Sequence, residues 1–371
     1  MDAPVVSRRF PMSSTGPGLK AHPVAHASII AALGLALVTA PGPGAAQQTA
    51  QERPPEAPSA VVMMYHRFGE SAWPSTNIRI DQFEAHLEEL ATGKYAVRPV
   101  ADIVDALKAG RPLPDRTIGL SIDDAFLSVY RQAWPRLRKA GLPFTLFVAT
   151  GAVDRRGKDY MNWDQIREMA RAGVTIGTHS VSHAHLPMLS AAAIEEELAK
   201  SNKRFEKELG FKPRLFAYPY GEASRAVMAA ARAAGYLAAF SQYSGVAHGK
   251  SNFFYLPRFA LNERYGALAR FRLAANALPL HATDITPRDP AISANPPAFG
   301  FTIGKGIRGL RSLACYSSAH GKLAIQRLGQ RRIEVRPPSA LKPGRSRINC
   351  TLPAGAARWR WLGYQFFVIK K

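Results

Sequence analysis

The chain has 371 residues, of which 47% are hydrophobic and 20% charged, and its formal net charge is +22. This length is sufficient for one large domain and a smaller one, and the composition is that of an ordinary soluble globular protein. The sequence shows neither heptads nor a repeat of about 20 to 50 residues, which excludes coiled coils and solenoids.

The first 46 residues differ from the rest of the chain. A basic start precedes an apolar run over residues 27–40, and small residues follow it. This layout predicts an export signal peptide over 1–46, cleaved before Gln47, with a retained membrane anchor as the alternative. The run is shorter than the roughly 20 residues of a membrane span, which favours cleavage. A Pro-rich linker is expected over 47–59, and we expect the protein in the periplasm or secreted, with association to the envelope as a variant.

Short apolar runs alternate with amphipathic segments between residues 60 and 286. The runs predict strands over 61–66, 117–123, 144–150, 174–179, 215–220, 238–242 and 256–261. The segments between them predict helices, among them 81–92, 100–110, 163–173, 190–210 and 224–235. Strands that alternate with helices of this length pair in parallel through crossovers. The sequence therefore predicts an α/β fold, a barrel or an open doubly wound sheet, with its chemistry at the carboxyl ends of the strands.

Two adjacent carboxylates follow the strand in "LSIDDAF", residues 120–126. Adjacent side chains on an extended chain point to opposite sides, so Asp123 and Asp124 cannot have the same role. One can bind a metal while its neighbour stays free as a base. For this motif alone, a loop or helix-capping pair is the alternative.

Histidines follow a later strand in "GVTIGTHSVSHAH", residues 173–185. His179 lies at the strand end and His183 about one turn further along the chain. One Asp with two His suits Zn²⁺, and three protein ligands leave a coordination position open. The alternative is that these imidazoles are structural. His185, beside a Leu-Pro pair, is interpreted as a turn residue rather than a ligand.

A third polar loop follows a strand in "LFAYPYGEAS", residues 215–224. Pro219 fixes the backbone and Gly221 frees it again. Such a loop can form a groove wall with a backbone N–H free to face a developing oxyanion. A plain Pro-Tyr-Gly turn is equally compatible with these residues.

In this order and roughly 40 to 55 residues apart, "SIDDAF", "HSVSH" and "AYPYG" resemble the first three motifs of the polysaccharide deacetylase family, the NodB-homology carbohydrate esterases. The resemblance covers about residues 60–285 and implies a distorted (β/α) barrel. Carried over by position, the resemblance implies that Asp123 is the catalytic base and that the metal ligands are Asp124, His179 and His183. It also implies that Pro219 forms a groove wall and that the backbone N–H of Tyr220 donates to the oxyanion.

The resemblance also implies the reaction. A divalent metal, Zn²⁺ before Co²⁺ or Ni²⁺, polarises an acetamide carbonyl and activates water. Asp123 takes the proton of the water, and a general acid protonates the leaving amine. The expected substrate is an N-acetylglucosamine-type polysaccharide or oligosaccharide, and acetate is released.

The chain departs from the family pattern at two positions. Ala125 follows Asp124 where the family usually has Gly, and Ala217 stands where the family often has an Arg that orients the base. Arg258 in "LPRF" is our candidate substitute for that Arg. The general acid is usually a His after a late hydrophobic strand, which predicts His281. His66, at the end of the first strand, is its rival and is expected to contact the substrate.

After a Pro-rich boundary, strand-like runs separated by turn residues replace the alternation of strands and helices. Residues 287–371 therefore predict a small all-β domain. Between residues 291 and 371, fifteen Lys and Arg residues stand against one acidic residue, Glu334, so most of the net charge lies here. We expect this surface to contact anionic glycan, an envelope polymer or an anionic membrane surface. The export signal argues against nucleic acid.

The chain has two cysteines, Cys315 and Cys350, both within this basic segment. An exported protein with one such pair favours a disulfide, with two buried thiols as the alternative.

The leading hypothesis is thus an exported, metal-dependent deacetylase of an N-acetylated glycan. A catalytically impaired glycan-binding protein is an alternative, favoured by Ala217 and by the two candidates for the acid. A metal-dependent amidase that acts on a non-sugar C–N bond is another. The full set of Asp123, Asp124 and the two histidines favours an enzyme, because a pure binding protein does not need it.

Overall fold

The computed structural model describes residues 57–369. The expected signal peptide over 1–46 and most of the linker over 47–59 lie outside the described residues. The described residues fall within one compact unit. Within residues 57–369, no helix has the length and apolar character that crossing a membrane requires.

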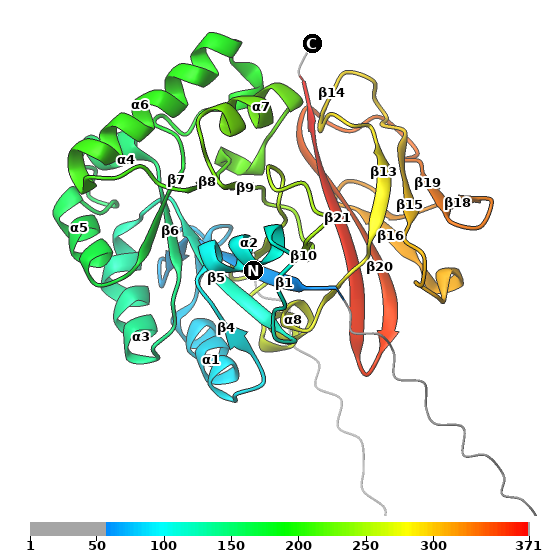
Figure 1. The fold of residues 1–371 in the computed structure, drawn as a ribbon, viewed down its shortest axis with the longest axis horizontal. Helices are drawn as coiled ribbons and strands as arrows, with labels where there is room; N and C mark the ends of the chain where they lie inside the picture. The colour runs from blue at the N-terminus through cyan, green and yellow to red at the C-terminus, as the bar shows by residue number, and fades with distance from the viewer. Residues whose placement is uncertain (1–56, 370–371) are drawn as a thin grey trace, which may run out of the picture. The chain divides into compact units, whose positions relative to one another are not determined.

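A nine-stranded sheet forms the centre of the first part of the structure, the α/β region (residues 59–275; Figure 1). Its strands are β1 (Ser59–Tyr65), β4 (Ala96–Val97), β5 (Thr117–Asp123), β6 (Thr145–Val148), β7 (Thr175–Thr178), β8 (Leu215–Ala217), β9 (Ala238–Phe240), β10 (Ala247–His248) and β11 (Phe259–Ala260). The order is β10-β1-β5-β6-β7-β8-β9, with β11 beside β1 and β4 beside β5. Every pair is parallel except β1 with β10. The curled parallel sheet confirms the predicted fold class, and each of the seven predicted strands is present.

Helices connect these strands. They are α1 (Ile80–Ala91), α2 (Val100–Lys108), α3 (Trp134–Lys139), α4 (Thr150–Asp154), α5 (Trp163–Arg171), α6 (Ala191–Leu209), α7 (Arg225–Ala233) and α8 (Leu268–Ala275). Shorter helical turns are η1 (Val129–Ala133), η2 (Leu186–Met188), η3 (Pro219–Gly221) and η4 (Leu310–Ser312). The chain marks the ends of α6 clearly, since the Ser190 side chain caps its first turn and Gly210, in the left-handed conformation, ends it.

The second part, the C-terminal β region (residues 278–368), is built from strands, as the sequence predicted. They are β12 (Leu278–Pro279), β13 (Ala282–Thr286), β14 (Ala291–Ile292), β15 (Phe299–Ile303), β16 (Ala314–Ser317), β17 (Gly321–Leu323), β18 (Ile325–Leu328), β19 (Arg332–Val335), β20 (Gly344–Gly355) and β21 (Arg358–Val368). One sheet has the order β12-β21-β20-β16-β17, with β14 on β21, and the other has β13-β15-β19-β18. A small parallel pair, β2 (Arg67–Phe68) and β3 (Asn77–Ile78), lies in the α/β region.

A disulfide joins Cys315 to Cys350, which lie directly opposite each other on β16 and β20. The predicted pairing is therefore confirmed, and it fastens the long β20–β21 hairpin to the strand beside it.

The two regions share a hydrophobic core. Phe216 and Tyr218 of the α/β region belong to the same buried cluster as Ile348 and Phe366 of the β20–β21 hairpin. Figure 1 shows this hairpin lying along the α/β region. The domain limits 60–286 and 287–371 stay a prediction. In the structure β12 and β13, which precede residue 287, already pair with strands of the C-terminal β region.

Candidate metal centre and active site

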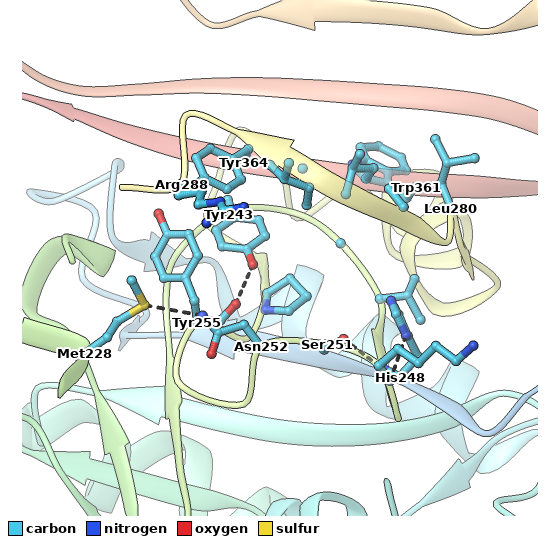
Figure 2. Close-up of a pocket in the computed structure, with 18 residues that line it drawn as sticks. Met228, Tyr243, His248, Ser251, Asn252, Tyr255, Leu280, Arg288, Trp361 and Tyr364 are labelled. Carbon is cyan, nitrogen blue, oxygen red and sulfur yellow. Dashed lines mark hydrogen bonds between the residues drawn. The ribbon is translucent and has the colours of Figure 1, made fainter. Parts of the chain in front are cut away.

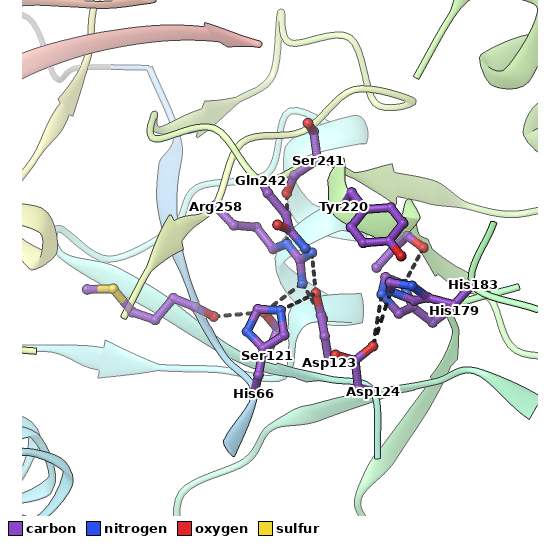
Figure 3. Close-up of polar contacts among 12 residues, drawn as sticks. His66, Ser121, Asp123, Asp124, His179, His183, Tyr220, Ser241, Gln242 and Arg258 are labelled. Atoms are coloured by element: carbon purple, nitrogen blue, oxygen red, sulfur yellow. Dashed lines mark hydrogen bonds and ion pairs between the residues drawn. The ribbon is translucent and has the colours of Figure 1, made fainter. Parts of the chain in front are cut away.

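The polar motifs of the sequence meet at the carboxyl edge of the α/β sheet. β5 ends at Asp123, β7 ends one residue before His179, and β8 ends shortly before Tyr220. β1 ends directly before His66. The carboxyl ends of parallel strands share one edge of a sheet, and Figure 3 shows these side chains gathered there around Arg258.

Three predicted ligands form a compact cluster in which the ligand atoms of Asp124, His179 and His183 lie within 4.8 Å of one another. Asp124 Oδ1 lies 3.5 Å from His179 Nε2 and 3.3 Å from His183 Nε2. One carboxylate and two imidazoles that face a common point suit a divalent transition metal such as Zn²⁺.

His179 is fully buried, yet only one of its ring nitrogens has a hydrogen-bond partner. Nδ1 lies 2.7 Å from the carbonyl oxygen of Ala217, which can only accept, so Nδ1 carries the proton. Nε2 is buried without a hydrogen-bond partner within residues 57–369 and keeps its lone pair. Burial lowers the pKa of His179 to about 3 and that of His183 to about 4, so both rings are neutral, the form that binds metals. The donor set therefore fits a divalent metal.

Asp123 faces the other side of the strand end and has a different partner. Both of its oxygens accept hydrogen bonds from the Arg258 guanidinium, at 2.7 Å and 2.8 Å, and both side chains are fully buried. Burial by itself raises the pKa of Asp123, but the positive charge of Arg258 and its hydrogen bonds lower that pKa to about 2. For Asp124 burial prevails and raises the pKa to about 6. The two adjacent carboxylates thus have the different surroundings that strand alternation predicted.

Arg258 itself is held from two further sides. Its Nε donates to the carbonyl oxygen of Ser241 at 3.0 Å, and its Nη1 donates to the hydroxyl of Ser121 at 3.2 Å. The structure therefore brings Arg258 to the predicted base, in place of an Arg at position 217, where the side chain is Ala217. The role of Arg258 in catalysis stays a prediction.

The loop after β8 reaches the cluster through Tyr220. Its ring packs edge-on against His183, with ring centres 4.4 Å apart, and Pro219 beside it is buried. Tyr220 has a left-handed backbone, with φ 57° and ψ 5°. Gly221 is required here, because its φ is +69° and a Cβ would lie 2.3 Å from the backbone nitrogen of Gln242. The loop has one defined shape beside the metal ligands.

Of the two candidates for the general acid, the structure brings only His66 to this edge. His66 Nε2 lies 3.9 Å from Asp123 Oδ2, and the side chain is 13% exposed. The ring of His281 packs edge-on against His248, with centres 4.5 Å apart. His248 pairs with Ser59, the first residue of β1, whereas His66 follows the last one. The structure therefore places His281 beside His248, near the start of β1, and His66 at the end of β1. Which of the two is the general acid stays a prediction.

A pocket of about 230 Å³ has a different lining, which includes His248, Tyr243, Tyr255 and Trp361 (Figure 2). The tyrosine hydroxyls already donate to backbone carbonyl groups, Tyr243 to Tyr255 and Tyr255 to Gln365. This cavity has none of the metal-ligand cluster, and we assign it no part in the chemistry.

Backbone strain concentrates around the cluster. Non-glycine residues with left-handed φ angles here are Asp124 (75°), Ala125 (57°), Ser180 (65°), His183 (59°) and Tyr220 (57°). Each such residue costs on the order of 1–3 kcal/mol, and such strain gathers at functional sites.

Sequence reasoning missed several residues that surround the site. Ser121 binds Arg258, and Glu222 accepts from His185 Nδ1 at 2.6 Å. Arg345 and Gln365, from β20 and β21, both donate to the Tyr220 carbonyl oxygen. No local pattern marks Arg345 or Gln365, which lie more than 100 residues further along the chain.

Parts of this chain are similar to known proteins. Residues 110–239 match the family model described as "Polysaccharide deacetylase". A Staphylococcus aureus protein named poly-β-1,6-N-acetyl-D-glucosamine N-deacetylase is 26% identical over 231 residues, 55% of this chain and 79% of its own. The Bacillus subtilis protein YxkH, which bears a polysaccharide deacetylase name, is 26% identical over 185 residues, 50% of this chain. The match spans 64% of the length of YxkH.

Two solved structures resemble the fold. IcaB from Ammonifex degensii is 26% identical, with a TM-score of 0.52, and the match covers 57% of this chain and 96% of that one. The deacetylase PplD from Streptococcus pyogenes, solved in complex with acetate, has a TM-score of 0.55 at 20% identity. That match covers 59% of this chain and 99% of PplD, and at this identity it supports the fold alone.

Proposed function

Because this chain, through residues 110–239, belongs to the polysaccharide deacetylase family, we propose that it is a metal-dependent N-deacetylase of a poly-N-acetylglucosamine-type glycan. One observation carries the proposal: the buried, ionised Asp123 lies directly beside a cluster of three metal-ligating side chains at one edge of the sheet. The name of the Staphylococcus aureus relative supports a β-1,6-linked polymer as the substrate class.

Asp124, His179 and His183 would hold the metal, with Zn²⁺ preferred over Co²⁺ and Ni²⁺. When bound, a divalent cation supplies Lewis-acid polarisation of the acetyl carbonyl and lowers the pKa of a water molecule. His179 is prepared for this role, since its protonated Nδ1 is fixed on the Ala217 carbonyl and its Nε2 is left for the metal.

Asp123 acts as the general base. Arg258 keeps it ionised at neutral pH and, by binding both oxygens, fixes the plane of the carboxylate. A carboxylate has about four acceptor positions, so Asp123 can still accept the proton of a water molecule that attacks the acetyl carbon.

The Tyr220 backbone N–H donates a hydrogen bond to the oxyanion of the tetrahedral intermediate, and Pro219 forms the adjacent wall of the groove. His66, 3.9 Å from Asp123, gives a proton to the amine as the C–N bond breaks. The oxygen of the water leaves in acetate, and the sugar keeps a free amine. Supporting this assignment, His66 is the candidate that shares the sheet edge with the base.

The proposal includes an extracytoplasmic location, in the periplasm or as a secreted protein. The predicted signal peptide and the disulfide between Cys315 and Cys350 support it, because such bonds persist in oxidising compartments. The basic C-terminal β region would then contact anionic envelope polymers or an anionic membrane surface.

The test uses purified protein stripped of metal with a chelator. Acetate release is measured on β-1,6-linked N-acetylglucosamine oligomers, and on chitin oligomers for comparison, with and without added Zn²⁺, Co²⁺ or Ni²⁺. Asp123→Asn removes the base and His179→Ala removes one ligand. We expect metal-dependent release from the wild type and a loss of at least about 10³-fold in kcat/KM for each variant.

The alternatives give different results. Stoichiometric metal binding and glycan binding without acetate release would indicate the glycan-binding protein. Metal-dependent hydrolysis of simple amides but not of glycans would indicate the amidase. A wild-type protein that binds no divalent metal would contradict the proposal of a metal-dependent enzyme.

A further inference from the structure

The β20–β21 hairpin of the C-terminal β region reaches the proposed oxyanion loop. Gln365 Nε2, from β21, donates to the carbonyl oxygens of Tyr220 at 3.2 Å and Gly221 at 2.7 Å. Arg345 Nη1, from β20, donates to the same Tyr220 oxygen at 3.2 Å. Two strands that lie more than 120 residues further along the chain thus converge on one peptide group.

The orientation of Gln365 is determined by its surroundings. Its side-chain oxygen accepts a hydrogen bond from Arg347 Nε at 3.0 Å, so its amide NH₂ must face the loop. The two carbonyl groups of the loop can only accept, which requires the same orientation. Gln365 is 1% exposed, so water does not replace these bonds easily.

Arg345 adds a second and more exposed contact. Its guanidinium carbon lies 5.4 Å from the centre of the Tyr220 ring, and its Nη1 also donates to Gln242 Oε1 at 3.3 Å. It further lies 3.7 Å from the buried carboxylate of Glu222, which binds His185, and the His185 ring stacks on Tyr220 with centres 4.3 Å apart. Ring and carbonyl of Tyr220 are therefore held together.

These bonds act where the backbone is strained. Tyr220 has φ 57° and ψ 5°, a backbone conformation that a residue other than glycine keeps only when its surroundings enforce it. Two donors on the Tyr220 carbonyl fix ψ, and the Gly221 N–H, which donates to the Tyr218 carbonyl at 2.8 Å, fixes the turn from within. The Glu222 N–H donates to the Pro219 carbonyl at 3.1 Å, in the peptide group that carries the Tyr220 N–H. With the peptide groups on both sides of Tyr220 held, the rotation that would redirect this N–H is limited.

From these contacts we infer that Gln365, assisted by Arg345, is a positioning residue that aims the Tyr220 N–H at the oxyanion, so that the C-terminal β region completes the active site. The inference rests on the proposed function. It gives the basic region a role in turnover that is separate from any contact of its surface with an anionic polymer.

The test replaces Gln365 by Met, which has nearly the same length but no donor. We expect kcat for β-1,6-linked N-acetylglucosamine oligomers to fall about 10- to 100-fold, because a misplaced donor loses much of its effect on the transition state. KM and the affinity for Zn²⁺ should stay within about twofold, because ground-state binding and the ligand cluster are untouched. Arg345→Met should lower kcat less, and Arg345→Lys, which keeps a donor and the charge, should restore part of it.

Asn349→Leu is the matched control. Asn349 lies on the same hairpin and accepts from Trp361 Nε1 at 3.1 Å, a bond that stays within the hairpin. We expect it to lower the unfolding midpoint without changing kcat per folded molecule. Equal kcat values for Gln365→Met and the wild type would overturn the inference while leaving the deacetylase intact. A parallel loss in Asn349→Leu would do the same, because it would indicate general destabilisation. If the wild type releases no acetate, the inference falls with the proposed function.

Discussion

Two histidines with no exposed surface, at two different places in the α/β region, show how a site differs from a core. His86 on α1 uses both ring nitrogens: Nδ1 lies 3.1 Å from the Tyr65 hydroxyl and Nε2 lies 2.8 Å from the Gly266 carbonyl oxygen. His179 uses only one, and its Nε2 is buried without a hydrogen-bond partner in the part of the chain that the structure describes.

Buried polar groups in proteins nearly always have a partner, so a buried nitrogen without one requires an explanation. Around His86 the backbone is helical and every ring atom that can bond does so. Around His179 the backbone takes left-handed conformations at Ser180 and His183. The difference indicates that His86 stabilises the fold, whereas His179 is held ready for a ligand.

Replacing each histidine by Ala and measuring unfolding with and without Zn²⁺ tests whether the two residues have different roles. At a Zn²⁺ concentration about 1,000 times the Kd, binding should add about 4 kcal/mol to the free energy of unfolding of the wild type. His179→Ala should lose nearly all of that increment. His86→Ala should keep the increment but unfold about 3 kcal/mol more easily in the absence of metal, because it leaves a cavity and unpaired polar groups.

Urea denaturation at fixed pH, in chelator or in excess Zn²⁺, gives both quantities. If His86→Ala removed the zinc increment, or His179→Ala retained it, the two histidines would not differ in the way their hydrogen bonds indicate.

The free energy of unfolding should also depend on pH through His86. Burial lowers the pKa of His86 to about 4, although its hydrogen bond to the Gly266 carbonyl acts in the opposite direction. In the unfolded chain His86 is protonated near pH 6.5, whereas in the folded protein it is protonated only near pH 4. His86 should therefore lower the free energy of unfolding by about 1.4 kcal/mol for each pH unit between those values as the pH falls.

Urea midpoints in chelator at pH 7, 6 and 5 test this, with His86→Gln as the variant that cannot titrate. His248, whose pKa burial lowers to about 3, titrates in both proteins and cancels in the difference. Equal slopes for the wild type and His86→Gln would contradict the assignment of His86 as a neutral core residue.

The sequence predicted those parts of the site that follow strands directly. Asp123, Asp124 and His179 lie at the ends of β5 and β7, where period-two alternation and the rule for parallel sheets determine which side and which edge a residue takes. The strands and helices themselves were predicted for the same reason, since their apolar periodicity is local.

The remaining parts depend on contacts that no local pattern records. His281 follows a strand, as predicted, but β12 pairs with β21, and the His281 ring packs against His248. Gln365 alternates within a long β-strand like any other residue, and only the packing of the hairpin on the α/β region brings it to Tyr220. Tertiary placement, and not residue type, decides both cases.

Ala125 is a case in which the sequence raised the question and the structure answers it. It stands where the resembled family usually has Gly, and its φ of 57° with a fully buried side chain shows a left-handed residue held in place by its surroundings. Ala133, equally buried, has an ordinary helical φ of −77°. The two alanines are therefore equally buried, and only Ala125 has a strained backbone.

Ala125→Gly should change the free energy of unfolding by less than about 0.5 kcal/mol, because relief of the left-handed strain, about 1–2 kcal/mol, offsets the lost methyl group and the greater freedom of the unfolded chain. Ala133→Gly has no strain to relieve and should cost about 1–2 kcal/mol. Chemical denaturation of both variants in chelator measures the difference. If the two substitutions cost the same, the left-handed loop at the metal cluster is not strained, and the contrast between the site and the core would rest on hydrogen bonding alone.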